Sequence, residues 1–270
     1  MNIVTFPGLN LKFELDRVAF KIFRIDIYWY SLLIVISIII GLILAKRKEG
    51  MYGIKFDNIL EGISITIPVS IIFARLYYVI FNLDDYTNIW NMFNIRNGGI
   101  AIYGCIIGGV ICLFVYSIIN KLNLLDLLDY IIPYVALGQS IGRWGNFINI
   151  ESYGSKYTGI FRMGIIENGQ YIEVHPTFLY ESIITLILFI TLIMCQKRRK
   201  YSGEILIVYL IIYSFFRAFI EELRVDSLMV GNIRISKALS ICIFIFSFSI
   251  YIINLLRNKI LKKEVSYEKI

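Results

Sequence analysis

Long runs of apolar residues dominate the chain and alternate with short stretches that carry most of its charges. Each run holds roughly 18 to 24 residues, the length that an α-helix needs to cross the apolar core of a bilayer. The pattern predicts an all-α polytopic membrane protein, with residues 1–270 forming a single integral membrane domain. We expect seven transmembrane helices, over Tyr28–Ala45, Ile59–Asn82, Gly99–Ile118, Leu124–Ile141, Thr177–Cys195, Ile205–Glu221 and Leu239–Leu256.

Residues 1–26 are too polar to span a bilayer and too apolar to form a solvated tail. We interpret them as an interfacial arm that lies on the membrane surface. Further along, Asn168-Gly169 separates two short runs that favour strands, and Asn-Gly is the strongest local signal for a tight β-hairpin. Residues 151–174 are therefore predicted to form a small extracytoplasmic head that contains a β-hairpin.

The orientation of the helices follows from the positive charges in the connections. Cations gather after the first, third, fifth and seventh runs, at Lys46, Arg47, Lys48, Lys55, Lys121, Lys197, Arg198, Arg199, Lys200, Arg257, Lys259, Lys262, Lys263 and Lys269. If seven spans alternate, these connections share one side, and the positive-inside tendency makes that side cytoplasmic. We expect the N-terminus outside and the C-terminus in the cytoplasm, although the cations within residues 1–26 oppose this orientation.

Composition supports a membrane protein and excludes several other classes. Of 270 residues, 58% are hydrophobic and only 17% are charged, too few to cover the surface of a soluble domain. The formal net charge is +7, but most cations lie beside the ends of apolar runs, where lipid phosphates explain them, so we expect no nucleic-acid partner. The four cysteines lie inside apolar runs and there is one histidine, so the sequence offers no metal site.

A polar stretch at the end of the fourth run, from Gly138 to Gly154, departs from this pattern. It places Arg143, Asn146 and Glu151 among closely spaced glycines. Charged and amide groups at a membrane boundary need partners, and small residues allow a ligand to approach the backbone. Because a guanidinium group is a planar donor suited to phosphate or carboxylate, the stretch predicts an anion site.

The sixth predicted helix carries a matching set of charges. Arg217, Glu221 and Arg224 are spaced i, i+4, i+7 and share one face, which Tyr213 extends by one turn. Arg217 lies about 18 Å from the cytoplasmic start of this helix, in the outer half of the bilayer. We predict that Arg217 and Arg224 hold Glu221 and leave at least one guanidinium group for a ligand, with Arg143 offering another. The result is an outward-facing, membrane-embedded anion pocket.

Other polar residues reach the same level, and each has an alternative explanation. Tyr30 opens the first helix, Tyr103 lies one turn into the third, and His175 and Glu181 flank the outer entry to the fifth. Tyr30 fits an aromatic belt equally well. His175 before Pro176 could transfer a proton, since histidine titrates near neutral pH, or could serve only to cap or orient a helix. The arginines nearer the interface, namely Arg75, Arg96 and Arg224, could be anchors that reach toward lipid phosphates.

At these residues the chain resembles a known family. Residues 142–154 read Gly-Arg-Trp-Gly-Asn-Phe-Ile-Asn-Ile-Glu-Ser-Tyr-Gly, which is similar to the signature of bacterial phosphatidylglycerol-prolipoprotein diacylglyceryl transferases. Further matches fall in the family's order over nearly the whole chain, at Trp29–Ser31, Ala74–Leu76, Gly98–Gly104, His175–Thr177, Leu179–Glu181, Tyr213–Arg217, Glu221 and Arg224. The resemblance implies seven spans and an extracytoplasmic head.

The resemblance also implies a reaction. The enzyme would transfer the diacylglyceryl group from phosphatidylglycerol to the lipobox cysteine thiol of a prolipoprotein, forming a thioether and releasing glycerol phosphate. Phosphatidylglycerol, the lipobox peptide and membrane lipids would be its partners, in the cytoplasmic membrane of a bacterium, and no metal or organic cofactor is expected. The sequence does not establish an oligomeric state, and we work with a monomer.

Each site residue then has an expected role. Arg143 and Arg217 would hold the headgroup phosphate, and Glu221 and Arg224 would fix Arg217. Asn146 and Glu151, which belong to the expected catalytic set, would position the headgroup and the peptide together with Tyr30. The expected substrate-binding residues also include Tyr213, Gly154 and His175. Many family members carry histidine where this chain has Tyr103, and that residue has been considered as a base. A phenol, whose ordinary pKa is about 10, is a weaker base at neutral pH, so the acceptor of the thiol proton stays open.

Two other classes fit parts of the pattern. A transporter of anions or lipid headgroups would also use arginines inside the membrane, but its polar groups would lie near the midplane of repeated halves. A non-catalytic membrane scaffold would tolerate changes at the arginines with little loss beyond stability. Substrate flux in vesicles would distinguish a transporter from an enzyme.

Overall fold

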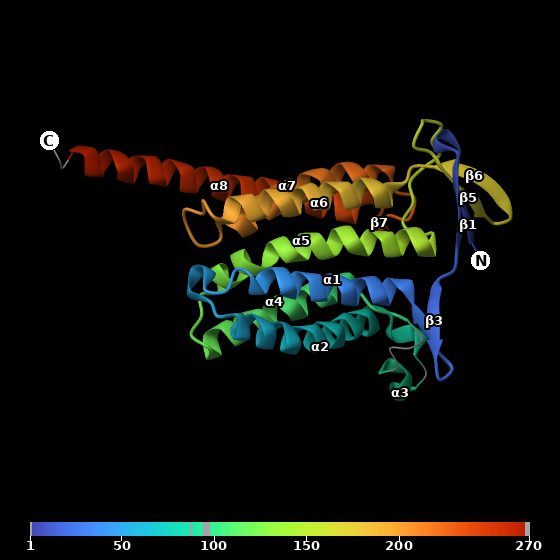
Figure 1. Cartoon of the computed structure of the whole chain (residues 1–270), viewed down its shortest axis with the longest axis horizontal. Helices are drawn as coiled ribbons and strands as arrows, with labels where there is room; N and C mark the ends of the chain where they lie inside the picture. Colours follow the sequence, from blue (N-terminus) through green and yellow to red (C-terminus); the bar gives the residue numbers. More distant parts are fainter. Residues whose placement is uncertain (1, 87, 94–97, 268–270) are drawn as a thin grey trace. The chain divides into compact units, whose positions relative to one another are not determined.

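The computed structural model describes residues 2–86, 88–93 and 98–267, and it is predominantly helical (Figure 1). The chain divides into two compact units, one formed by Met1–Ile43 with Ile132–Ile270 and the other by Leu44–Ile131. The helices are α1 (Trp29–Lys46), α2 (Phe56–Phe81), α3 (Ile89–Met92), α4 (Ile102–Ile119), α5 (Leu124–Asn149), α6 (Thr177–Gln196), α7 (Glu204–Leu223) and α8 (Ile235–Tyr267). Short 3-10 helices cover Pro7–Leu9, Met51–Gly53 and Leu83–Asp85.

Six helices of the described residues are long and apolar enough to cross a membrane, namely α1, α2, α4, α5, α6 and α8. The chain is therefore a multi-pass membrane protein. The seventh predicted span corresponds to α7, whose 20 residues are long enough but include Arg217, Glu221 and Glu222. Charges of this kind are rare in membrane spans and concentrate where a bundle carries function. The seventh span and the orientation of the bundle stay predictions.

The predicted head hairpin is confirmed. Strand β5 (Met163–Glu167) pairs antiparallel with β6 (Gln170–Val174), with Glu167 opposite Gln170. The connecting Asn168 and Gly169 both have positive φ, of 50° and 79°. Positive φ at both central residues is the geometry of a type I′ turn, which Asn-Gly favours.

The N-terminal segment contains strands, so the description of residues 1–26 as only an interfacial arm is incomplete, and so is the all-α class. Strands β1 (Asn2–Phe6) and β2 (Leu11–Leu15) join the head in a four-stranded sheet of order β2-β1-β5-β6. A separate two-stranded sheet consists of β3 (Val18–Ile22) and β4 (Ile25–Tyr28), and a third consists of β7 (Met229–Val230) and β8 (Ile233–Arg234). The strands of residues 1–28 were not predicted because charged residues interrupt the alternation of apolar and polar positions that is typical of a strand.

Two apolar clusters hold the larger unit together. Val4 and Met163 from the head sheet pack with Phe147 of α5 and Phe178 of α6, whose rings stack with centroids 4.5 Å apart. This packing explains why α5 continues to Asn149, beyond the predicted end at Ile141, because the glycine-rich stretch buries Phe147 against the head. A second cluster joins α5, α6 and α7, which run side by side (Figure 1), through Ile132, Ala136, Leu188, Leu192, Ile205 and Tyr209.

Candidate functional site

Three arginines converge on one carboxylate, that of Glu181 near the start of α6. Nη2 of Arg143, on α5, lies 2.5 Å from Glu181 Oε2. Nη1 of Arg217, on α7, lies 3.1 Å from Glu181 Oε1. Arg224, directly after α7, brings Nη1 to 3.9 Å from the same oxygen. Residues from three helices, far apart in the sequence, thus meet at one point within the larger unit.

Two further carboxylates complete this site. Arg217 Nη2 lies 2.6 Å from Glu221 Oε2, an i,i+4 pair on α7. Arg224 grips Asp226 with two hydrogen bonds of 2.9 Å each, one from Nε and one from Nη2. We define the arginine cluster as the six residues Arg143, Glu181, Arg217, Glu221, Arg224 and Asp226.

The charges of the arginine cluster balance, since it contains three arginines and three carboxylates. The predicted pairing of Arg217 with Glu221 is confirmed, whereas the prediction that Arg224 also holds Glu221 is wrong, because Arg224 pairs with Asp226. Arg217 bridges Glu181 and Glu221, and Arg224 pairs with Asp226. The physical reason is that a buried cation without a partner is far more costly than a pair.

Burial within the cluster is uneven. The side chain of Glu181 is 4% exposed, whereas those of Arg143 and Arg217 are 20% and 15% exposed. The carboxylate therefore lies deeper than the guanidinium groups that it attracts. A guanidinium group has five N–H donors, and the described pairs of Arg143 involve only Nη1 and Nη2. An incoming anion would meet the arginines before the carboxylate.

The last two turns of α5 bring several predicted site residues together. Arg143 Nη1 donates a hydrogen bond of 3.2 Å to Asn146 Oδ1. The ring of Tyr30, at the start of α1, packs on Gly145, where a Cβ atom would collide with it. Glu151 follows α5, and its backbone N–H donates to the carbonyl of Asn146 at 2.9 Å, while its side chain is exposed. Asn146 and Tyr30 thus adjoin the helix segment that presents Arg143.

Gly154 joins the loop after α5 to the end of α7. It forms a β-bridge with Arg224, and its N–H donates to the His175 carbonyl at 3.0 Å. A Cβ atom at this position would lie 2.6 Å from the Cβ of His175 and 3.1 Å from the carbonyl oxygen of Leu223. Arg224 Nη2 adds a hydrogen bond of 2.8 Å to Ser152 Oγ in the same loop. Only glycine fits this close approach, which explains why the sequence has glycine here.

His175 belongs to the junction between the head and α6. Its ring stacks on Tyr157, with centroids 3.9 Å apart, and its Nδ1 lies 3.3 Å from Tyr180 Oη. Burial lowers the pKa of His175, which favours the neutral imidazole at pH 7. These contacts fit the alternative that His175 orients the segment before α6.

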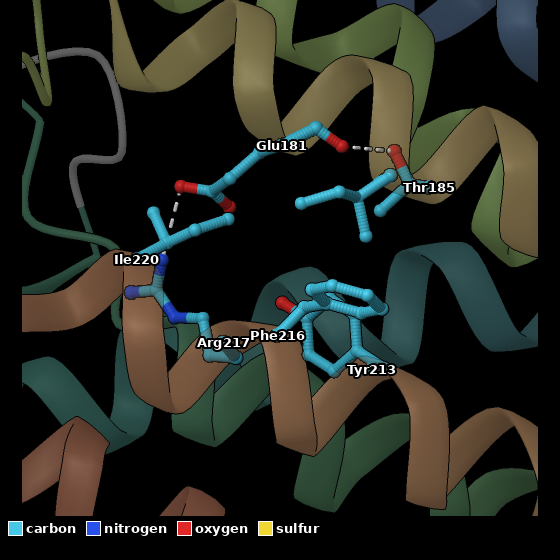
Figure 2. A pocket seen from close by; sticks show the side chains of 7 residues that line it. Glu181, Thr185, Tyr213, Phe216, Arg217 and Ile220 are labelled. Atoms are coloured by element: carbon cyan, nitrogen blue, oxygen red, sulfur yellow. Dashed lines mark hydrogen bonds and ion pairs between the residues drawn. The ribbon is translucent and has the colours of Figure 1, made fainter. Parts of the chain in front are cut away.

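A small pocket opens between α6 and α7 beside Arg217 (Figure 2). Glu181 and Arg217 point toward one another on one side, and the rings of Tyr213 and Phe216 face the space from α7. Its cavity volume is about 10 Å³, about the room that one water molecule needs and far less than the roughly 300 to 1,000 Å³ of typical small-molecule sites. Tyr213 is itself fixed by Tyr209, whose ring lies parallel to it at 5.4 Å.

Tyr103 lies in the first turn of α4 and belongs to the smaller unit, Leu44–Ile131. Its ring centroid is 6.4 Å from that of Tyr77 on α2. Its role as a base stays a prediction. Arg96, which the sequence offered as a possible anchor, lies outside the described residues.

Arg75, also in the smaller unit, is not a lipid anchor but a buried residue with 6% exposure. Its Nε donates to the carbonyl of Met92 at 2.7 Å and its Nη2 to that of Asn91 at 2.9 Å. Its Nη1 donates to the carbonyls of Gly98 and Gly99, at 2.7 and 2.9 Å. Arg75 therefore connects the end of α3 to Gly98 and Gly99, which precede α4.

Glu181, Asp226 and Ser152 were not among the predicted catalytic or substrate-binding residues. Glu181 had a signal, since it is the one acidic residue in the apolar run of α6 and ends the matching segment Leu179–Glu181. Asp226 lies two residues after Arg224, a spacing that no helical pattern highlights. Within the described part of the chain, no group of three or more His, Cys, Asp or Glu side chains is placed to hold a metal ion.

Comparison with known proteins relates this site to one family. The chain matches the family model described as prolipoprotein diacylglyceryl transferase over residues 17–253. It is 44% identical over 228 residues to the phosphatidylglycerol-prolipoprotein diacylglyceryl transferase of Clostridioides difficile (strain 630), covering 84% of this chain and 90% of that protein. It is 42% identical over 252 residues to the protein of the same name from Clostridium novyi (strain NT), covering 91% and 98%.

Proposed function

We propose, from the premise that the chain belongs to the prolipoprotein diacylglyceryl transferase family, that its arginine cluster binds the phosphate of the lipid donor. The chain transfers the diacylglyceryl group of phosphatidylglycerol to a prolipoprotein, the first step of lipoprotein maturation. The observation that carries the proposal is the convergence of Arg143 and Arg217 on Glu181. Two guanidinium groups that already share one carboxylate are spaced to share a phosphate as well.

The reaction is a substitution at carbon. The lipobox cysteine sulfur attacks the glycerol carbon that bears the phosphate, and a carbon–sulfur bond forms as the carbon–oxygen bond breaks. The bonding electrons leave with the oxygen of glycerol phosphate, and the thiol proton passes to a base. Because negative charge grows on the leaving oxygen, guanidinium groups aimed at it stabilise the transition state more than the bound substrate. The step requires no metal or organic cofactor.

Glu181 serves this reaction by holding the arginines in place. Three guanidinium groups within one small site repel one another unless a carboxylate lies among them. Glu181 supplies that charge from the buried side, and the more exposed faces of Arg143 and Arg217 receive the lipid phosphate. Glu221 fixes Arg217 from the next turn of α7.

The surrounding residues position the two substrates. Asn146 orients Arg143 through the hydrogen bond between them. Arg224 ties the loop that carries Ser152 and Gly154 to the end of α7, rather than fixing Arg217 directly. The remaining members of the proposed substrate site are Tyr30, Glu151, Tyr213 and His175.

The thiol proton needs an acceptor, and the candidates are Tyr103, at a position where many family members carry histidine, and His175. The cysteine thiol, with an ordinary pKa of about 8.5, needs only a modest shift to ionise near neutral pH. Because the arginine cluster is neutral as a whole, a nearby base supplies that shift. Loss of activity in Tyr103→Phe, with normal folding, would support this role for Tyr103, and full activity would exclude it.

The proposal includes a seventh span and an orientation. With α7 as a span, the connections rich in Lys and Arg share the cytoplasmic side, and the head and the arginine cluster face outward. A bacterial cytoplasmic membrane then presents phosphatidylglycerol and secreted prolipoproteins on the same side of the protein. We propose that the enzyme acts as a monomer, without nucleic acid.

The proposal is tested with Arg143→Ala, assayed by transfer of labelled diacylglyceryl from phosphatidylglycerol vesicles to a lipobox peptide. Removal of one donor to a developing anion typically lowers kcat by about 10² to 10³, and we expect a loss of at least that size. The matched control is Arg162→Ala, which removes an arginine that pairs with Glu173 at 2.9 Å in the head. The control should retain activity within about twofold, because its ion pair is outside the cluster. Equal activity of the two variants, both folded, would contradict the proposal.

A further inference from the structure

The hairpin formed by β3 and β4 has one apolar face and one polar face. Its register places Phe20 opposite Ile27 and Ile22 opposite Ile25, and these pairs share one face because directly opposite residues in an antiparallel pair point to the same side. Lys21 pairs with Asp26 on the other face, with 3.2 Å between Lys21 Nζ and Asp26 Oδ1.

No third strand pairs with this hairpin among the described residues, since β3 and β4 form a two-stranded sheet of their own. Phe20, Ile22 and Ile25 are 45%, 47% and 58% exposed. At the tip, Phe23 is 96% exposed. An isolated two-stranded hairpin is at best marginally stable in water, so the apolar face requires a partner.

The position of the hairpin in the chain indicates which partner. Strand β4 ends at Tyr28 and α1 begins at the next residue, Trp29. In Figure 1 the hairpin crosses the end of α1 rather than continuing along its axis. If α1 spans the membrane, the hairpin lies at the level of the lipid headgroups, where exposed aromatic residues such as Tyr28 and Trp29 concentrate.

The charges of the hairpin fit a lipid surface. Lys21 is exposed on the polar face, and Arg24 is exposed beside Phe23 at the tip. Apolar side chains flanked by cations are the arrangement that enters the boundary between acyl chains and anionic headgroups. Phe23 and Arg24 both have positive φ, of 46° and 78°, which turns the tip tightly and presents the phenyl ring outward.

From these observations we infer that residues 18–28 form a lipid-binding hairpin whose apolar face and Phe23 tip insert into the leaflet around the outer end of α1. The hairpin fixes the height of the N-terminal segment relative to the bilayer. Arg17, immediately before it, donates to the carbonyl of Asn149 at 2.8 Å. The lipid contact thus connects directly to the end of α5, which carries the site residues. The inference concerns the position of the hairpin and holds whether or not the arginines bind phosphate.

The test uses a fluorescent NBD group attached to Phe23→Cys, in a chain whose native residues Cys105, Cys112, Cys195 and Cys242 are replaced by alanine. The protein is reconstituted into phosphatidylcholine vesicles containing phosphatidylglycerol, with and without brominated lipids. The matched control carries the same group at Ile166→Cys, on β5 of the head, where the native side chain is 55% exposed. We expect blue-shifted emission and several-fold stronger quenching by brominated lipid at position 23 than at position 166.

Three outcomes would overturn the inference. Equal quenching at the two positions would mean that the hairpin lies in water. Blue-shifted emission without lipid quenching would mean that the apolar face packs on protein. A blue shift that appears only after addition of a lipobox peptide would identify a peptide-docking surface. If the labelled chain fails to fold, Phe23→Trp with a Trp29→Phe, Trp90→Phe, Trp144→Phe background provides the same quenching measurement without a label.

Discussion

Arg217, whose side chain is 15% exposed, and Arg75, which is 6% exposed, satisfy their charges in opposite ways. Arg217 contacts the carboxylates of Glu181 and Glu221. Arg75 donates four hydrogen bonds to backbone carbonyls and has ring contacts with Tyr78 and Tyr86. One arginine therefore belongs to a network of charged side chains, and the other holds backbone carbonyls.

This difference distinguishes Arg217, an arginine of a binding site, from Arg75, an arginine with a structural role. A carboxylate and a phosphate both present negatively charged oxygens at a spacing that fits a guanidinium group. A lipid phosphate can therefore share an arginine with Glu181. Backbone carbonyls cannot move aside without unfolding the loop that contains them. Whether an arginine pairs with carboxylates or with backbone carbonyls thus indicates whether it is available to an anionic ligand. Burial alone does not indicate this.

Among the substitutions that test this comparison, Glu181→Gln is expected to have the largest effect on activity. The substitution keeps the size of the side chain but changes the formal charge of the cluster from zero to +1. We expect KM for phosphatidylglycerol to fall and kcat to fall by about 10² or more, because the phosphate binds to arginines that are no longer aligned. Steady-state kinetics in vesicles measure both constants. Glu181→Asp should recover part of kcat, and a rise in KM with unchanged kcat would show that Glu181 does not align the arginines.

Arg75→Ala should have its main effect on stability. It leaves the carbonyls of Asn91, Met92, Gly98 and Gly99 without their donor, and loss of buried partners of this kind costs about 2 kcal/mol or more of the free energy of unfolding. Thermal unfolding in detergent micelles would report a lower Tm, while KM for phosphatidylglycerol should stay unchanged. Arg75→Lys should recover part of the stability, because an ammonium group still offers three donors. A raised KM for phosphatidylglycerol in Arg75→Ala would contradict the view that Arg75 has only a structural role.

The smallest expected effect is on the loss of thermal stability at low pH, and it concerns Asp226. Burial acts to raise the pKa of Asp226, but the hydrogen bonds and charge of Arg224 more than offset it and hold this pKa below its ordinary value. A lowered folded-state pKa gives stability that is present above the unfolded pKa, about 3.9, and is lost as the pH falls through the folded value. The drop in Tm between about pH 6 and pH 3 should therefore be smaller in Asp226→Asn than in the parent chain. Arg75→Ala should leave the acid-dependent drop unchanged, since its carbonyl partners do not titrate in this range.

Much of the helical fold could be predicted from the sequence, because each span is a continuous apolar run. The head hairpin was equally visible, since Asn168-Gly169 specifies its turn locally. The extension of α5 was not, because glycines and polar residues after Ile141 resemble a helix end. What keeps that segment helical is the burial of Phe147 against the head, a contact with distant parts of the chain that no local pattern reports.

The site was predicted only in part, because local spacing shows contacts within one helix but not contacts between helices. Arg217 and Glu221 share a helix face, so their spacing revealed the pair. The meeting of Arg143 with Arg217 on Glu181 depends on how three helices pack, which spacing along one helix cannot give. The partner of Arg224 was missed because Asp226 lies beyond the end of α7, where helical periodicity no longer applies.

The head sheet has a consequence for the order of events during synthesis. Its strand β1 lies between β2 and β5, and Thr5 pairs with Gly164. The β1–β2 hairpin is therefore synthesised before β5, and one edge of β1 stays unpaired until α1 through α5 have been made. If this hairpin has crossed the membrane by then, the emerging Met163–Val174 hairpin closes that edge from the outside. Slow insertion of any intervening helix would prolong the exposure of an unpaired strand, a vulnerability to proteases that lasts only until the protein is complete.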